Sequence, residues 1–122
     1  MTKRILIVED QEDNRAIMRD ILSSAGYALI EAIDGEEGVK LARSERPDLI
    51  LMDIQLPMLD GYEATRQIRA IDELKSVPII AVTSYALSGD EALARSAGCD
   101  THVAKPFSPR ELLAKVQEFL AQ

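Results

Sequence analysis

Short, strongly apolar runs alternate along this chain with longer stretches in which apolar residues recur every three or four positions. The first run, Ile5–Val8, is continuously apolar, which is typical of a parallel strand covered on both faces. Later runs of similar character predict further strands. The predicted strands cover residues 5–8, 27–32, 49–52, 77–82 and 101–104.

The stretches that follow the strands carry helical spacing and capping residues. In the first of them, Ile17 and Ile21 are four residues apart, and Gly26 follows as a C-cap. The last begins with Ser108 and Glu111 in the spacing of a capping box. Similar pairs, Asp34 with Glu37 and Ser88 with Glu91, begin the second and fourth helices. The predicted helices cover approximately residues 12–25, 34–44, 64–71, 88–98 and 108–120.

Strands and helices that alternate in this way predict an α/β fold. Right-handed crossovers place the connecting helices on both faces of one sheet, so the prediction is a doubly wound sheet of five parallel strands. The 122 residues fit one domain, and no linker, low-complexity stretch or internal repeat divides them. We therefore expect a single domain over residues 1–122.

The charge balance argues against nucleic acid as a direct partner. Lys and Arg together number 14 and Asp and Glu 21, which gives a net charge of −7. No run of basic residues follows one predicted helix, so the electrostatic footprint of nucleic-acid binding is missing.

The cysteine count and the first residues indicate a reducing compartment. Cys99 is the single cysteine and cannot form an intramolecular disulfide. The chain runs from Met1 directly into an apolar strand rather than through a signal peptide, and its apolar runs are too short to span a bilayer. We expect a cytoplasmic protein without membrane contact.

Polar residues stand where four of the predicted strands end. They are Glu9 and Asp10, Asp53, Thr83 and Lys105. The carboxyl ends of parallel strands share one edge of a sheet, so we expect these side chains to converge there. Two carboxylates roughly 5 Å apart repel each other by about 3 kcal/mol at an effective dielectric of about 20, which favours a bound cation. Oxygen ligands without nearby His or Cys favour Mg²⁺.

The same edge carries groups suited to a phosphoryl group. Lys105 supplies an ammonium charge and Thr83 a hydroxyl donor. Positioning and charge neutralisation contribute most of the catalysis of phosphoryl transfer, and an aspartate nucleophile would form an acyl phosphate. The sequence therefore predicts phosphoryl transfer at Asp53.

At these motifs the chain resembles a known family, the receiver domain of two-component response regulators, in its single-domain form. The motifs lie at residues 8–10, at 52–57 with Gly61, at 82–84 and at 105–107, and the resemblance extends over the whole length. It implies a flavodoxin-like (βα)5 fold.

The resemblance also implies roles for the strand-end residues. Asp53 would accept a phosphoryl group from a phosphohistidine on a histidine kinase or histidine phosphotransferase. Asp10, Asp53 and the backbone carbonyl of Gln55 would hold Mg²⁺, with Glu9 acting through water. Lys105 would pair with the Asp53 carboxylate or its phosphate.

Further positions would tune the switch. Thr83 would bond a phosphoryl oxygen and move toward it, and His102 occupies the position where many receivers have a switching Tyr or Phe. Gln55 and Tyr85 would influence the lifetime of the phosphate, and Pro106 would follow Lys105 through a cis peptide bond.

Phosphorylation would change the surface formed by the fourth helix, fifth strand and fifth helix, and this surface would control binding to a downstream protein target. The chain would act as a monomer or as a phosphorylation-linked dimer.

Other functions remain alternatives at this stage. An aspartate-dependent Mg²⁺ phosphohydrolase would carry a second Asp two residues after its nucleophile, where this chain has Gln55. A constitutive receiver-like interaction module would need none of the chemical groups present. A flavin-binding protein would need a Ser/Thr/Gly-rich phosphate loop after the first strand, which is missing here.

Simpler interpretations exist for single residues. Asp53 would by itself fit a cap for local amides, and Thr83 a bond to the backbone. Lys105 would fit a solvated charge, and Glu9 an exposed acid beside Asp10. The alignment of all of them at one predicted edge favours the functional interpretation.

Overall fold

A computed structural model describes residues 2–56, 59–83 and 88–120. Its strands are β1 (Arg4–Val8), β2 (Ala28–Ala32), β3 (Leu49–Asp53), β4 (Ile79–Thr83) and β5 (Thr101–Ala104). Its helices are α1 (Glu12–Ser24), α2 (Gly35–Glu45), α3 (Gly61–Arg69), α4 (Ser88–Ala97) and α5 (Pro109–Leu120), with a short 3₁₀ helix, η1 (Asp72–Leu74).

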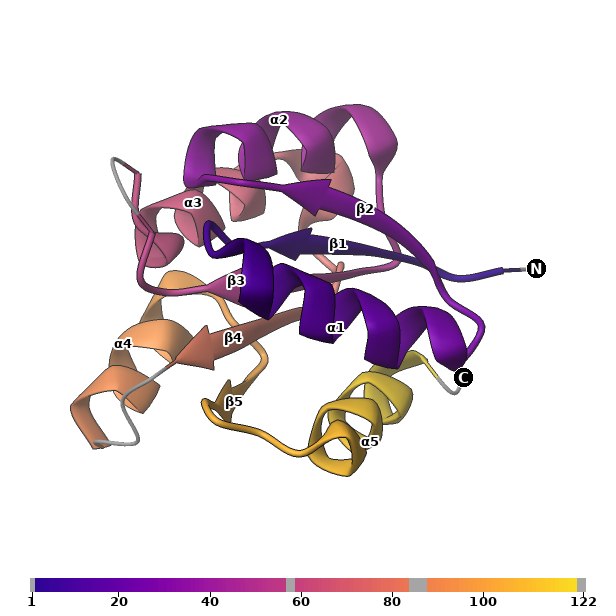
Figure 1. The fold of residues 1–122 in the computed structure, drawn as a ribbon. Helices are drawn as coiled ribbons and strands as arrows, with labels where there is room; N and C mark the ends of the chain where they lie inside the picture. The colour runs from indigo at the N-terminus through magenta and orange to yellow at the C-terminus, as the bar shows by residue number, and fades with distance from the viewer. Residues whose placement is uncertain (1, 57–58, 84–87, 121–122) are drawn as a thin grey trace.

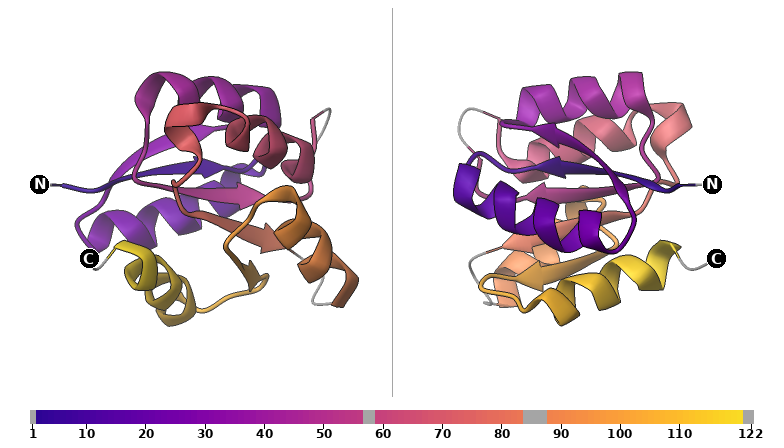
Figure 2. Two further views of the ribbon diagram at one scale, coloured as in Figure 1. Left: turned by 180° about the vertical axis from the view of Figure 1, so that it is seen from behind. Right: turned by 45° about the vertical axis from the view of Figure 1, so that its right-hand side comes forward.

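The strands form one parallel sheet in the order β2-β1-β3-β4-β5. Helices α1 and α5 cover one face of this sheet, and α2, α3 and α4 cover the other (Figures 1 and 2). This arrangement confirms the predicted doubly wound, flavodoxin-like α/β fold. It places the carboxyl ends of all five strands along one edge.

Two hydrophobic cores lie on the two faces of the sheet. Alternate residues of each central strand point to opposite faces, so Leu6 and Ile50 pack under α2 and α3 while Ile7 and Leu51 pack under α1 and α5. Strands β1, β3 and β4 are buried on both sides, which explains why their sequences are continuously apolar.

Capping residues begin α2 and α5 as predicted, whereas the side chains of the predicted pair Ser88 and Glu91 at the start of α4 lie outside what the structure describes. The Asp34 side chain accepts a hydrogen bond from the Glu37 N–H at the start of α2. At the start of α5, Ser108 and Glu111 form a full capping box, because each side chain accepts from the other residue's N–H. Gly26 follows α1 with a positive φ of 94°, as a C-terminal glycine should.

Several predicted boundaries differ from the observed ones by one to three residues, and the largest difference is the start of α3, which begins at Gly61 rather than near residue 64. The second strand begins at Ala28, because the Tyr27 N–H donates to Leu22 O and completes the end of α1. Strand β4 begins at Ile79 rather than Val77. Helix α3 ends at Arg69, so Ile71 does not lie on it, although Ile71 still packs against the core.

Candidate functional site

The strand-end residues converge as the topology requires. Glu9 and Asp10 follow β1, Asp53 ends β3, and Thr83 ends β4. In the register of the sheet Thr83 lies beside Ala104, the residue before Lys105. The Lys105 N–H donates to the Thr83 carbonyl over 2.6 Å, which links the ends of β4 and β5.

Three carboxylates form a cluster at this edge. Glu9, Asp10 and Asp53 each offer an oxygen, and these atoms lie within 4.8 Å of one another. Glu9 is fully buried and Asp53 is 3% exposed, whereas Asp10 is half-buried at the mouth of the cluster. The simple interpretation of Glu9 as an exposed acid is therefore wrong.

Lys105 joins the two buried carboxylates. Its Nζ lies 2.8 Å from Glu9 Oε1 and 3.3 Å from Asp53 Oδ2, and its side chain is 16% exposed. The second oxygen of each acid accepts a backbone N–H, that of Gln11 for Glu9 and that of Gln55 for Asp53, both over 3.0 Å. Both carboxylates are thus held from two sides, and the Lys105 side chain is not a solvated charge.

Burial and proximity shift two pKa values in the cluster. Burial raises the pKa of Glu9, with a smaller opposing effect from the Lys105 hydrogen bond and a further increase from Asp53. Burial would lower the pKa of Lys105, but its hydrogen bonds and charge interactions with Glu9 and Asp53 outweigh that effect and raise it. Lys105 therefore stays an ammonium ion over the physiological pH range.

The donor set fits a hard divalent cation. It consists of carboxylate oxygens, with a single ammonium against three acids. No His or Cys belongs to the cluster among the residues that the structure describes. Such an oxygen-only set suits Mg²⁺ or Ca²⁺ better than softer metals.

The chain after β3 folds back tightly against the cluster. A Cβ atom on Gly61 would lie 2.3 Å from the Asp53 carbonyl oxygen, so only glycine allows this approach. The Gly61 N–H donates to Ile54 O over 3.1 Å, and Asp60 caps α3 by accepting from Glu63 N–H. These contacts account for the glycine in the motif.

The remaining predicted residues lie around the cluster or apart from it. Thr83 is 4% exposed at the end of β4, and the Lys105–Pro106 peptide bond is cis. Gln55 is exposed and provides its N–H to Asp53. The predicted lifetime residue Tyr85 lies outside the described residues.

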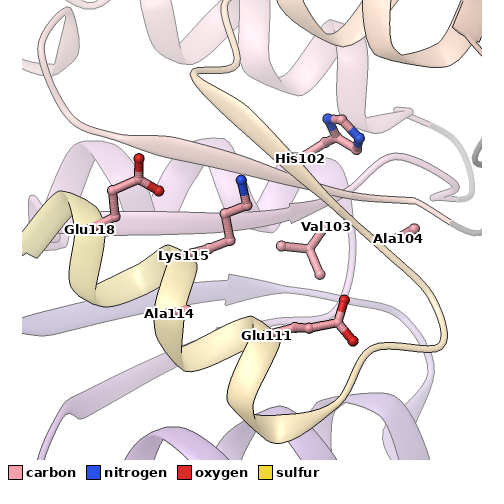
Figure 3. A pocket seen from close by; sticks show the side chains of 7 residues that line it. All are labelled: His102, Val103, Ala104, Glu111, Ala114, Lys115 and Glu118. Carbon is pink, nitrogen blue, oxygen red and sulfur yellow. The ribbon is translucent and has the colours of Figure 1, made fainter.

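His102 lies away from the carboxylates, in the middle of β5. It lines a pocket of about 540 Å³ between β5 and α5, together with residues such as Glu111, Lys115 and Glu118 (Figure 3). In the register of the sheet it lies beside Ala81. The structure therefore does not bring it into the acidic cluster, and its predicted role as a switch residue is not tested by its position.

One residue near the cluster was not predicted. Arg15, on α1, donates from Nη1 to the Glu9 carbonyl oxygen over 3.0 Å. This contact could not be predicted from the sequence, because a charged residue on an amphipathic helix normally faces solvent.

Comparison with known proteins agrees with this site. A family model for the response regulator receiver domain matches residues 5–117. The polar-differentiation response regulator DivK of Brucella anthropi is 43% identical over 120 residues, which cover 98% of each chain. DivK of Brucella ovis is 42% identical with the same coverage.

Solved structures share the whole fold. The receiver domain of sensor histidine kinase PA1611 from Pseudomonas aeruginosa PAO1, with a magnesium ion coordinated in its active-site cleft, has a TM-score of 0.93 and 42% identity, and all of both chains is covered. Chemotaxis protein CheY4 of Vibrio cholerae has a TM-score of 0.93 and 28% identity, with 98% of this chain and 99% of CheY4 covered. No helix in the described ranges is long and apolar enough to cross a membrane. By its family match, its relatives and its fold, this chain belongs to the response regulator receiver domains.

Proposed function

We propose that this chain is a phosphorylation-dependent signalling switch, with Asp53 as its phosphoacceptor. Receiver domains act as signalling switches rather than as classical enzymes. One observation carries the proposal: the nearly buried Asp53 carboxylate lies at a strand end between an ammonium group and two further acids. A structural cap would need neither the ammonium group nor the second and third carboxylates.

Asp10, Asp53 and the backbone carbonyl of Gln55 would hold Mg²⁺, and Glu9 would act through water. The magnesium ion in the cleft of the PA1611 receiver supports this assignment. When bound, the metal would neutralise charge on the carboxylates and on the phosphoryl oxygens. Glu9 and Asp53 each use one oxygen for a backbone N–H, and this holds their other oxygens toward the cluster.

In the transfer, an Asp53 oxygen would attack the phosphorus of a phosphohistidine. A P–O bond forms as the P–N bond breaks, and the imidazole nitrogen of the donor keeps the electron pair. Lys105 now lies 3.3 Å from Asp53 Oδ2, so it would exchange this carboxylate oxygen for a phosphoryl oxygen. Hydrolysis of the acyl phosphate by water would return the free carboxylate.

The phosphoryl group would bias two existing conformations of the chain. The carbonyl of Thr83 accepts a hydrogen bond from the Lys105 N–H. The Thr83 hydroxyl would bond a phosphoryl oxygen and move toward it. The change would reach the surface of α4, β5 and α5, where His102 is one of the residues that line the pocket beside α5 (Figure 3). A downstream protein target would bind this surface, and the chain would act as a monomer or as a phosphorylation-linked dimer.

The phosphodonor would be a histidine kinase or histidine phosphotransferase, and the setting would be cytoplasmic. Gln55 and Tyr85 would set the lifetime of the acyl phosphate. A phosphohydrolase is disfavoured because Gln55 stands where that class needs a second acid, and it donates only its backbone N–H to Asp53.

A small phosphodonor tests the proposal. Acetyl phosphate with MgCl₂ should add one phosphoryl group to the wild type, measured by intact mass, and beryllofluoride with MgCl₂ should change its NMR spectrum. Asp53→Ala should abolish both effects. Asp13→Ala, which removes an exposed acid on α1, is the matched control and should react like the wild type. A wild type that stays unmodified, or an Asp53→Ala variant that reacts normally, would refute the proposal.

A further inference from the structure

Arg15 connects the acidic cluster to helix α1 and strand β2. Its Nη1 donates to the Glu9 carbonyl over 3.0 Å, and its Nε lies 3.3 Å from Glu31 Oε1. Its Nη2 also contacts Glu12 Oε2. The Arg15 side chain is 13% exposed, so this guanidinium is a largely enclosed link rather than a surface charge.

The Glu9 carbonyl belongs to the peptide unit that carries Asp10. The amide side of Glu9 is already fixed, because its N–H donates to Ala32 O over 3.0 Å. Arg15 fixes the carbonyl side, so both hydrogen-bonding groups of the Glu9 main chain are held. The orientation of the next residue, Asp10, follows from this peptide.

Asp10 depends on its backbone more than the other two acids do. Glu9 and Asp53 are held by Lys105 and by backbone N–H groups. Within the described residues, the Asp10 carboxylate forms no hydrogen bond or ion pair of its own. Its place within 4.8 Å of the other two acids therefore depends on its main chain and its rotamer rather than on a side-chain partner.

We propose that Arg15 is a positioning residue for the metal site: by bonding the Glu9 carbonyl it holds the Asp10 carboxylate ready for a divalent cation. The inference rests on the proposed function, because it assumes that Asp10 binds Mg²⁺. Partners that orient metal ligands typically contribute 10-fold to 100-fold to metal affinity, so loss of Arg15 should weaken Mg²⁺ binding on the order of 10-fold.

Electrostatics alone predicts the opposite sign. The chain has a net charge of −7, and removal of a cation near the cluster makes its surroundings more negative, which should strengthen Mg²⁺ binding. Weaker Mg²⁺ binding after loss of Arg15 would therefore show that Arg15 acts by positioning Asp10 and not through its charge.

Arg19 provides a matched control. It contacts the same two acids, with Nη2 3.3 Å from Glu12 Oε1 and Nη1 3.5 Å from Glu31 Oε1, but no contact joins it to Glu9 among the described residues. Arg19→Ala removes the same charge from the same helix and leaves the Glu9 carbonyl bonded to Arg15.

The test is calorimetric titration with MgCl₂ alone, on variants shown to be folded by circular dichroism. Arg15→Ala should raise the Mg²⁺ Kd on the order of 10-fold, and Arg19→Ala should leave it unchanged or lower it. Arg15→Lys keeps the charge but offers one nitrogen for the three acceptors that Arg15 contacts, so its Kd should lie between those of the wild type and Arg15→Ala. It also provides the test if Arg15→Ala fails to fold.

The outcomes separate the two proposals. If the wild type binds Mg²⁺ and Asp10→Asn weakens that binding while Arg15→Ala and Arg15→Lys leave the Kd unchanged, the positioning role is refuted and the metal site stands. Equal losses in Arg15→Ala and Arg19→Ala would also refute it. If the wild type itself does not bind Mg²⁺, the metal site and the positioning role both fail.

Discussion

Replacement of Lys105 by methionine should destabilise the metal-free protein strongly. Met keeps an unbranched side chain of similar length but removes the ammonium that contacts Glu9 and Asp53, which are 0% and 3% exposed. The offered oxygens of these acids lie within 4.8 Å of one another, so at an effective dielectric of about 20 the two carboxylates repel by at least about 3 kcal/mol. Removal of one partner from a buried ion pair typically costs about 3–5 kcal/mol. Lys105 keeps some contact with solvent, so we expect a loss of about 3 kcal/mol.

The assay is urea unfolding in EDTA at neutral pH, followed by circular dichroism. Lys75→Met is the control, because Lys75 is 63% exposed and its pair with Asp72 should contribute less than about 1 kcal/mol. Added MgCl₂ should stabilise Lys105→Met more than the wild type, because a bound cation replaces the missing charge.

The pH dependence of Lys105→Met gives an independent check. The pKa of Glu9 is raised by burial, so in the folded state Glu9 takes up a proton at a higher pH than it does when unfolded. A group with a raised folded pKa favours the folded state below its unfolded pKa, near 4.5, and this contribution is lost as the pH rises through the folded value. Without Lys105 the Glu9 pKa should rise further. The stability difference between variant and wild type should therefore shrink as the pH falls from neutral toward that value.

A Lys105→Met variant as stable as the wild type in EDTA at neutral pH would refute this reasoning. So would a stability difference that neither MgCl₂ nor a lower pH reduces, because the loss would then come from packing and not from repulsion between buried acids.

Other predictions follow from single contacts. Gly61→Ala should destabilise the fold by about 1–3 kcal/mol in urea unfolding, because its Cβ would lie 2.3 Å from the Asp53 carbonyl; an unchanged midpoint would contradict this close approach. Cys99 is buried, which raises the pKa of its thiol, so iodoacetamide at neutral pH should modify it only in denaturant, as mass spectrometry would show. Ser108→Ala should cost about 1 kcal/mol, since it removes the hydrogen bond that Ser108 accepts from the Glu111 N–H; the free energy of unfolding checks this value.

The sequence predicted the elements and the residues gathered at the site because both depend on local pattern. Continuous apolar runs mark strands that are buried on both faces, and a parallel sheet brings their carboxyl ends to one edge. The topology alone was therefore enough to predict that four strand-end residues lie at the same edge of the sheet: Asp10, Asp53, Thr83 and Lys105. The capping box at Ser108 was predictable in the same way, because its two residues are close in sequence.

Features that depend on tertiary packing could not be predicted. Glu9 is completely buried, and its 2.8 Å contact with Lys105 joins residues far apart in the chain. An acid next to Asp10 in the sequence indicates neither the burial nor the contact. The contact from Arg15 to the Glu9 carbonyl requires the orientation of α1 on the sheet. Ile71 packs against the core as predicted, although helix α3 ends before it, at Arg69. The spacing of apolar residues indicates which side chains are buried, but it does not indicate where a helix ends.

The central claim is that Asp53 carries the phosphoryl group, and chemical localisation tests it most directly. The protein would be phosphorylated with acetyl phosphate and MgCl₂ and then reduced with borohydride, which converts an aspartyl phosphate to homoserine. Peptide mass spectrometry should find homoserine at position 53, and none there when MgCl₂ is replaced by EDTA. Homoserine at Asp10 or at another acid, with Asp53 unmodified, would contradict the account.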